Sequence, residues 1–106
     1  MERQGLAPYT LSRQSAREPT MAKVEIYTTG MCGFCYRAKR LLESKGVDYE
    51  ETDVTFNPDK RAAMTARSGS RTVPQIWING RFVGGSDDLY ALEEEGKLDT
   101  LLGETA

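Results

Sequence analysis

The chain contains no histidine and only two cysteines among its 106 residues. These absences argue against a structural zinc site within one chain, which requires four cysteine or histidine ligands, although a metal shared between chains stays open. So few cysteines also do not suit a secreted scaffold held together by disulfide bonds. The formal net charge of −2 lacks the basic excess of a nucleic-acid-binding protein. No apolar run is long enough to cross a bilayer, so the composition predicts one globular domain.

Residues 1–20 differ in composition from the rest of the chain. They are rich in polar residues and proline and show neither helical nor strand periodicity. This predicts a flexible N-terminal extension at 1–20, followed by one domain at 21–106. The extension lacks the continuous apolar core of a secretory signal. We expect Met21 to be the natural start, and mass spectrometry that finds Met1 at the N-terminus of the native protein would refute this.

From residue 21 onward the sequence alternates between strand and helix patterns, which predicts an α/β fold. An apolar stripe of Cys35, Ala38, Leu41 and Leu42 marks the first helix, which would connect two parallel strands. Asn79-Gly80 predicts a type I′ hairpin turn. The expected strands are 23–28, 47–54, 73–78 and 81–83. The expected helices run from the cysteines to 45, from Asn57-Pro58 to 68, and from Ser86 or Asp87 to 95, with a short last helix near 98–102.

The cysteines form the motif Cys32-Gly33-Phe34-Cys35 at the turn between the first strand and the first helix. A C-x-x-C pair at such a turn is typical of thiol–disulfide chemistry. Cys32 would precede the first helical turn, where unpaired backbone N–H groups and the helix dipole favour a thiolate. Cys35 belongs to the apolar stripe, so we predict Cys32 as the attacking thiolate and Cys35 as the resolving thiol. The competing interpretation makes Cys35 a small core residue and Cys32 an incidental surface thiol.

The second motif is Thr72-Val73-Pro74, with Pro74 at the start of a predicted strand. Proline cannot donate to a strand ladder and belongs at a strand start, an edge or a cis bond. A cis bond would leave the backbone of Val73 free to pair with an extended peptide substrate. A trans proline that begins an ordinary edge strand is the alternative.

The third motif is Gly84-Gly85-Ser86-Asp87-Asp88. Glycines allow close approach of the backbone, and the N-terminus of the helix that follows can bind a carboxylate. The side chain of Asp87 could meet an ammonium group. The alternative is a plain turn in which Ser86 or Asp87 caps the helix.

These motifs stand in the order and spacing of the glutaredoxin family, which the chain resembles from about residue 23 to 102. The resemblance implies a thioredoxin fold, with a four-stranded mixed β-sheet flanked by helices and a cis Pro74 facing the cysteines. It also implies glutathione as co-substrate: Val73 would pair with the backbone of its cysteine, and Ser86 and Asp87 would hold its γ-glutamyl end. The glutathione-binding residues implied are Arg71, Thr72, Val73, Pro74, Gly85, Ser86 and Asp87.

The sequence departs from the family pattern near the first cysteine. Gly33-Phe34 replaces the usual Pro-Tyr, and Thr29 replaces a lysine that supports the thiolate and the glycyl carboxylate of glutathione. Arg67 or Arg71 would take over the carboxylate contact, and Arg71 is the one included in the expected site. Cys-Gly-Phe also begins the motif of the monothiol branch, but Cys35 stands where that branch has serine.

The leading hypothesis is a glutathione-dependent oxidoreductase that reduces protein disulfides and glutathione mixed disulfides. The alternative is an iron–sulfur carrier, in which Cys32 from two chains and two glutathiones hold a [2Fe–2S] cluster. A thioredoxin-like reductase served by a flavoprotein is a third interpretation, but Met31 stands where that family has tryptophan. The expected partners are glutathione and glutathionylated or disulfide-containing proteins, not nucleic acid or a membrane. We expect a cytoplasmic monomer, or a dimer bridged by the cluster.

Overall fold

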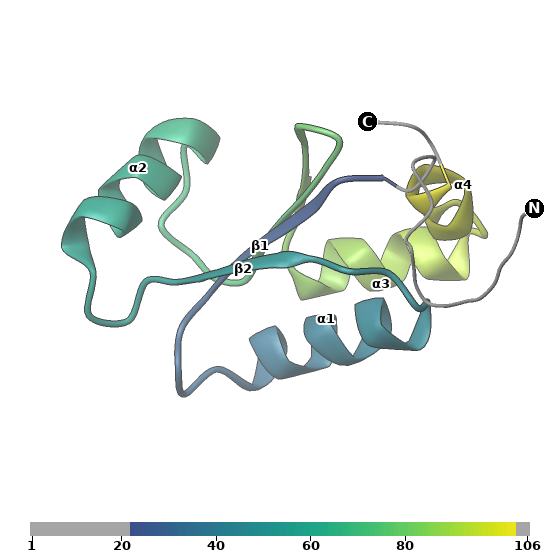
Figure 1. Cartoon of the computed structure of the whole chain (residues 1–106), viewed down its shortest axis with the longest axis horizontal. Helices are drawn as coiled ribbons and strands as arrows, with labels where there is room; N and C mark the ends of the chain where they lie inside the picture. The colour runs from purple at the N-terminus through teal and green to yellow at the C-terminus, as the bar shows by residue number, and fades with distance from the viewer. Residues whose placement is uncertain (1–21, 104–106) are drawn as a thin grey trace, which may run out of the picture.

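The computed structural model describes residues 22–103, which form a four-stranded mixed sheet flanked by helices (Figure 1). The expected extension at 1–20 and the proposed start at Met21 lie outside the described residues. The strands are β1 Val24–Thr28, β2 Glu50–Asp53, β3 Gln75–Ile78 and β4 Arg81–Gly84. The helices are α1 Gly33–Ser44, α2 Pro58–Ser68, α3 Ser86–Glu94 and α4 Leu98–Leu102.

The strands lie in the order β2-β1-β3-β4. β1 and β2 are parallel and joined through α1, whereas β3 is antiparallel to β1 and forms a hairpin with β4. The hairpin turns at Asn79 and Gly80, whose φ angles of 53° and 80° are both positive. Positive φ at both positions is what a type I′ turn requires, so the prediction for this turn is confirmed.

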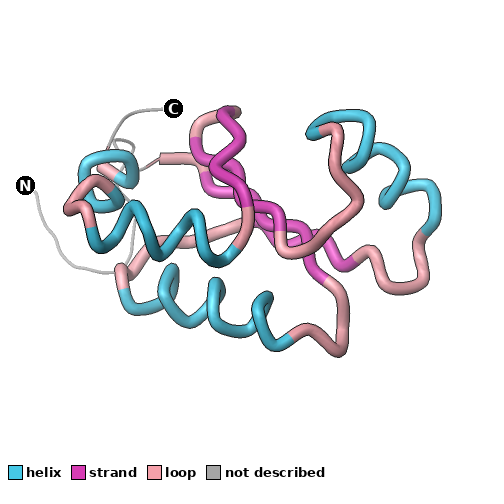
Figure 2. Tube along the Cα trace, turned by 180° about the vertical axis from the view of Figure 1, so that it is seen from behind, coloured by secondary structure: helices cyan, strands magenta, loops and turns pink. Residues whose placement is uncertain are grey.

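The helices cover both faces of the sheet. α1 and α3 lie together on one face and α2 lies on the other (Figures 1 and 2). The face toward α1 and α3 holds the main apolar core, because alternate side chains of β1 and β3 meet the apolar stripe of α1 there. Members of this core include Val24, Ile26, Leu42, Ile76 and Leu89, all at most 2% exposed.

Two strand boundaries differ from the sequence prediction. β2 covers only Glu50–Asp53, because pairing with β1 extends over that segment alone, although Val47 and Val54 on either side are buried. β3 begins at Gln75 rather than at residue 73. Pro74 has no N–H to give to a ladder, and Gln75 is the first residue in register with β1.

The N-terminus of α3 also differs from the prediction. The capping position is Gly85, not Ser86 or Asp87. Asp88 in the first turn accepts a hydrogen bond from the Gly85 N–H at 2.9 Å, which is one half of a capping box. Gly84 has a φ of 122°, and a Cβ added to it would overlap the Asp88 carboxylate. This start of α3 therefore depends on a glycine at position 84.

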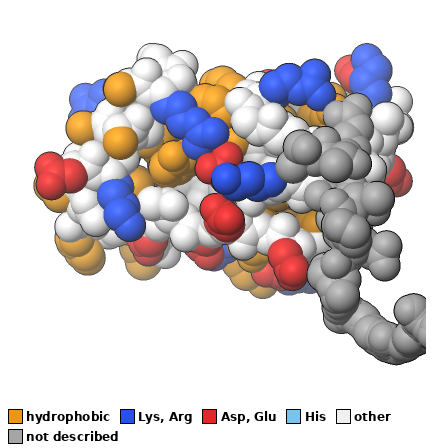
Figure 3. All heavy atoms as spheres, turned by 45° about the horizontal axis from the view of Figure 1, so that its top comes forward, with side chains coloured by type: hydrophobic (Ala, Val, Ile, Leu, Met, Phe, Trp, Pro, Cys, Tyr) orange, Lys and Arg blue, Asp and Glu red, His pale blue; other side chains and the backbone are white. Residues whose placement is uncertain are grey.

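On the side of the molecule drawn in Figure 3, basic and acidic side chains are interspersed. Among residues 22–103, no helix has the length and apolar character needed to span a membrane.

Candidate active site

Cys32 occupies the N-cap position of α1. Its φ and ψ of −127° and 105° are extended, and its Sγ accepts a hydrogen bond from the Cys35 N–H at 3.1 Å. An acceptor at this position meets the unpaired N–H groups of the first turn, where the helix dipole favours negative charge. Position and hydrogen bond together give the sulfur of Cys32 the surroundings that stabilise a thiolate.

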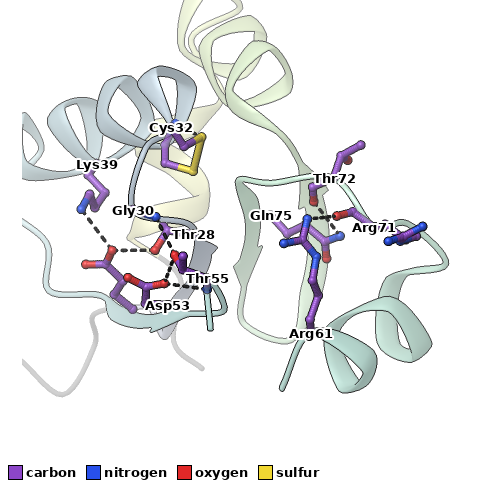
Figure 4. Close-up of a disulfide and its surroundings, with 12 residues drawn as sticks. Thr28, Gly30, Cys32, Lys39, Asp53, Thr55, Arg61, Arg71, Thr72 and Gln75 are labelled. Atoms are coloured by element: carbon purple, nitrogen blue, oxygen red, sulfur yellow. Dashed lines mark hydrogen bonds and ion pairs between the residues drawn. A yellow bond between two sulfur atoms is a disulfide. The ribbon is translucent and has the colours of Figure 1, made fainter. Parts of the chain in front are cut away.

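Cys32 and Cys35 are joined by a disulfide in the structure (Figure 4), with their Cα atoms 5.2 Å apart. The expected difference in burial is present, because Cys35 is only 2% exposed and Cys32 is partly exposed. An incoming group therefore has access to Cys32, while Cys35 can reach only its neighbour.

Neither nearby cation of α1 is directed to this sulfur. Lys39 Nζ lies 3.0 Å from Glu51 Oε2, which also accepts a hydrogen bond from Thr28 Oγ1 at 2.7 Å. The guanidinium of Arg37 lies over the ring of Tyr90, 4.8 Å from its centre. The N-terminus of α1 is therefore the main source of thiolate stabilisation that these contacts offer.

The loop before Cys32 is tied to the end of β2. Gly30 N–H donates to Thr55 Oγ1 at 2.7 Å, and Thr55 donates to Asp53 Oδ1 from its hydroxyl at 2.5 Å and from its backbone at 2.8 Å (Figure 4). The hydroxyl bond, followed by the backbone bond, holds the pKa of Asp53 below its ordinary value. Nothing in the sequence pointed to Thr55, because this contact joins segments 25 residues apart.

Several large apolar side chains are exposed, and two of them, Met31 and Phe34, lie within two residues of Cys32 in the sequence. Met31 is fully exposed, Phe56 is 96% exposed, and Phe34 is 57% exposed. A pocket of about 350 Å³ is lined by Gly30, Asp53, Thr55, Phe56 and Asn57. The sequence neighbours of Cys32 therefore include two exposed apolar side chains, although large apolar residues are more often buried.

The second and third motifs lie next to each other. The Val73–Pro74 peptide bond is cis, which decides between the alternatives left by the sequence. A Cβ added to Gly85 would lie 3.5 Å from the carbonyl oxygen of Pro74, so the backbones of these segments are close. Thr72 is exposed and lies in the surroundings of the disulfide (Figure 4).

Ser86 and Asp87 occupy the first turn of α3 and differ in burial. Ser86 is 4% exposed, and its Oγ has no hydrogen-bond partner among residues 22–103. Asp87 is exposed, whereas the carboxylate of Asp88 is held by the Gly85 N–H. The first turn of α3 thus offers one buried hydroxyl and one exposed carboxylate beside Pro74.

The arginines proposed for a carboxylate contact have different surroundings. Arg67 makes a bidentate pair with Glu25, at 3.0 and 3.2 Å, and lies 3.8 Å from the centre of the Trp77 ring. Its hydrogen bond is the main cause that lowers the pKa of Glu25. Arg71 is exposed, and its carbonyl accepts a hydrogen bond from Arg61 Nη2 at 3.1 Å. The guanidinium of Arg67 is therefore already paired with a strand residue of the sheet, Glu25. Arg71 lies on the loop before the cis proline.

Comparison with known proteins gives a consistent answer. The glutaredoxin family profile matches residues 24–83. Glutaredoxin 3 of Escherichia coli strain K12 is 55% identical over 82 residues, which are 77% of this chain and 99% of that protein. The solution structure of a glutaredoxin from Brucella melitensis is 54% identical, with a TM-score of 0.71, over 79% of this chain and 91% of that one.

A further solved structure is a complex of buckwheat glutaredoxin with glutathione. It is 29% identical, with a TM-score of 0.70, and the match covers 79% of each chain. The four-stranded mixed sheet and flanking helices agree with the expected thioredoxin fold. With its paired cysteines at the N-terminus of α1, the chain belongs to the glutaredoxin family of thiol–disulfide oxidoreductases.

Proposed function

We propose that the protein is a glutathione-dependent oxidoreductase that reduces glutathione mixed disulfides and protein disulfides. Cys32 is the nucleophile and Cys35 the resolving thiol. The observation that carries this proposal is the N-cap position of Cys32, with its Sγ accepting the Cys35 N–H at 3.1 Å while Cys35 is buried. A thiolate held in this way attacks at neutral pH without a histidine base.

The reaction is a sequence of thiol–disulfide exchanges. The Cys32 thiolate attacks the glutathione sulfur of a mixed disulfide; a Cys32–glutathione disulfide forms, the original S–S bond breaks, and the substrate leaves as a thiolate that takes up a proton. A second glutathione thiolate then attacks the glutathione sulfur bound to Cys32. This releases glutathione disulfide and restores the Cys32 thiolate. One free glutathione is consumed, and the other half of the glutathione disulfide comes from the substrate.

Cys35 provides a second route. Its thiolate attacks the sulfur of Cys32, expels the bound thiol and forms the Cys32–Cys35 disulfide, which two further glutathiones reduce. This route suits protein disulfides, because the resolving thiol is already in place. The short separation of the Cα atoms, 5.2 Å, supports the closure.

The glutathione site is proposed along the loop before Pro74 and the first turn of α3. Val73 would pair with the backbone of the glutathione cysteine beside Thr72 and Pro74. Ser86 and Asp87, next to Gly85, would hold the γ-glutamyl end; the unpaired Ser86 Oγ and the exposed Asp87 support this assignment.

The glycyl carboxylate is assigned to Arg71. Its side chain is exposed on the loop, and Arg61 brings a second guanidinium to the same backbone. Arg67 is the weaker choice, because a move toward substrate would break its bidentate pair with Glu25.

The cellular compartment proposed for the protein follows from this chemistry. Exchange with glutathione runs where thiols are kept reduced, so we place the protein in the cytoplasm, acting as a monomer. Its protein substrates would carry glutathionylated cysteines or accessible disulfides.

A shared [2Fe–2S] cluster is the second candidate function. A Cβ added to Gly33 meets nothing within 4 Å, so the space beside Cys32 is open, as a bridging group requires. Within residues 22–103 no three His, Cys, Asp or Glu side chains form a group able to hold a metal. The ligands would therefore be Cys32 of two chains and two glutathione thiolates. Anaerobic reconstitution with glutathione should give a coloured dimer, and a colourless monomer would contradict the proposal.

The test of the main proposal uses a glutathionylated peptide, glutathione and a coupled measurement of glutathione disulfide. Cys32→Ser should abolish turnover, whereas Cys35→Ser should retain much of it, because glutathione itself can resolve the Cys32 intermediate. Turnover by Cys32→Ser would show that the roles are assigned wrongly. A wild type that reduces protein disulfides but not the glutathionylated peptide would contradict the glutathione dependence.

A further inference from the structure

The loop at residues 70–72 has all of its backbone carbonyls held by side chains from outside the loop. Gln75 Nε2 donates to the carbonyl of Ser70 at 2.8 Å and to that of Thr72 at 3.0 Å. Arg61 Nη2 donates to the carbonyl of Arg71 at 3.1 Å. Gln75 comes from the first position of β3 and Arg61 from α2, so elements on both sides fix the same short segment (Figure 4).

Gln75 is the central member of this arrangement. Its side chain is 1% exposed, and both Nε2 hydrogens are used, which fixes the orientation of the amide. Its Oε1 has no hydrogen-bond partner among residues 22–103. An apolar side chain of similar length would fill the same space without burying an unpaired acceptor. Compared with such an apolar side chain, the amide of Gln75 therefore contributes only the two hydrogen bonds to the loop.

The consequence for the loop is a defined outward surface. With their carbonyls directed to Gln75 and Arg61, Arg71 and Thr72 remain exposed, and Val73 follows directly. These are the residues assigned to glutathione above. A loop that is already fixed in the free protein loses no further conformational entropy when the ligand binds. The binding free energy therefore carries no cost for ordering the loop, and the affinity is higher.

We infer that Gln75 is a positioning residue for glutathione, holding the 70–72 loop in its binding conformation through the carbonyls of Ser70 and Thr72. The inference rests on the proposed function of the same site. The hydrogen bonds of Gln75 go to the loop and to neither cysteine, and on this assignment Gln75 is not one of the residues that hold the substrate. Its effect is on ground-state binding and not on the exchange at sulfur.

The test compares Gln75→Met with the wild type, using a glutathionylated peptide as substrate and glutathione as reductant. Loss of the amide bonds should raise KM for the peptide about three- to tenfold with kcat changed by less than about twofold. The rate of Cys32 alkylation by iodoacetamide as a function of pH should be unchanged. Gln75→Glu, which replaces the donor by an acceptor facing both carbonyls, should raise KM at least as much.

Ile76→Val is the matched control for a general loss of stability. Ile76 is the next residue of β3, is fully buried, and belongs to the main apolar core, whereas the hydrogen bonds to the loop carbonyls come from Gln75 and Arg61. The Ile76→Val substitution should lower the melting temperature without changing KM for the glutathionylated peptide. If Ile76→Val shifts KM as Gln75→Met does, or if both Gln75 variants keep the wild-type KM, the inference is overturned. A wild type that does not turn over the glutathionylated peptide overturns the proposed function instead.

If the Gln75 variants do not fold, a measurement on a protein that keeps Gln75 and the 70–72 loop tests the inference. Coupling between two events is reciprocal, so a loop held by Gln75 that favours glutathione binding must itself be stabilised by bound glutathione. In the Cys35→Ser protein, glutathionylation of Cys32 should slow hydrogen exchange of the Gln75 side-chain amide, measured by NMR, by about threefold or more. An unchanged exchange rate would overturn the inference.

Discussion

Replacing Glu25 by glutamine should remove a pH-dependent part of the free energy of unfolding. Arg67 holds both carboxylate oxygens of Glu25, at 3.0 and 3.2 Å, and the Glu25 side chain is only 20% exposed. This hydrogen bonding is the main reason why the pKa of Glu25 lies below its ordinary value. A partly exposed bidentate pair of this kind contributes about 1 kcal/mol, at the upper end for surface pairs.

The sign follows from the direction of the shift. Because the pKa of Glu25 is lower in the folded protein, the unfolded chain binds this proton more readily. The stabilisation is complete above the ordinary carboxyl pKa of 4.5 and is lost as the pH falls through the folded value below it. Wild type should therefore exceed Glu25→Gln by about 1 kcal/mol at neutral pH, with the difference shrinking in acid.

Urea denaturation followed by fluorescence of Trp77, the only tryptophan, measures this difference directly. Glu94→Gln is the control, because Glu94 is an exposed carboxylate near the end of α3. A difference between wild type and Glu25→Gln that stays constant from neutral pH to pH 3 would refute the reasoning. Loss of activity at neutral pH in Glu25→Gln would refute the assignment of this pair to the scaffold.

Other variants probe the site and its support. Arg71→Ala should raise KM for a glutathionylated peptide about two- to fivefold, an effect reduced by salt, while Arg67→Ala should leave KM unchanged; the reverse pattern would exchange their roles. Asp88→Ala removes the acceptor of the Gly85 N–H and should lower the free energy of unfolding, measured in urea, by about 1 kcal/mol. An unchanged free energy of unfolding would show that this bond does not form in solution. Leu42→Ala in the fully buried core of α1 should cost about 2–5 kcal/mol, measured in the same way; a cost below 1 kcal/mol would contradict its burial.

The parts of the fold that could be predicted from the sequence are those set by interactions between residues close together in the chain. The Asn79-Gly80 turn and the cap at Cys32 are set by residues within a few positions, and the apolar stripe of α1 follows one period. The capping position of α3 was not predictable in the same way, since Ser86, Asp87 and Gly85 all suit a helix start. The hydrogen bond that the Asp88 carboxylate accepts from the Gly85 N–H decides among them.

The supporting residues of the site were not predictable, for a different reason. Gln75, Thr55 and Arg61 act by donating to or accepting from backbone groups, and any loop offers such groups at every residue. Thr55 reaches Gly30 across 25 positions, a contact that exists only after β1 and β2 have paired. The reactive pair could be read from the sequence because its chemistry needs cysteines, whereas a backbone contact leaves no such signature.

The cap of α1 couples the redox state of the protein to the stability of a helix. The sulfur of Cys32 is both the reactive atom and the acceptor for the first turn. As a thiolate it carries a full charge into that turn, and in any disulfide the charge is gone, so the helix end is better satisfied in the reduced protein. Stabilising the reduced form makes the disulfide form the stronger oxidant, as thermodynamic linkage requires. Changes in the first turn that weaken the cap should therefore shift the redox equilibrium toward the disulfide, without touching either cysteine.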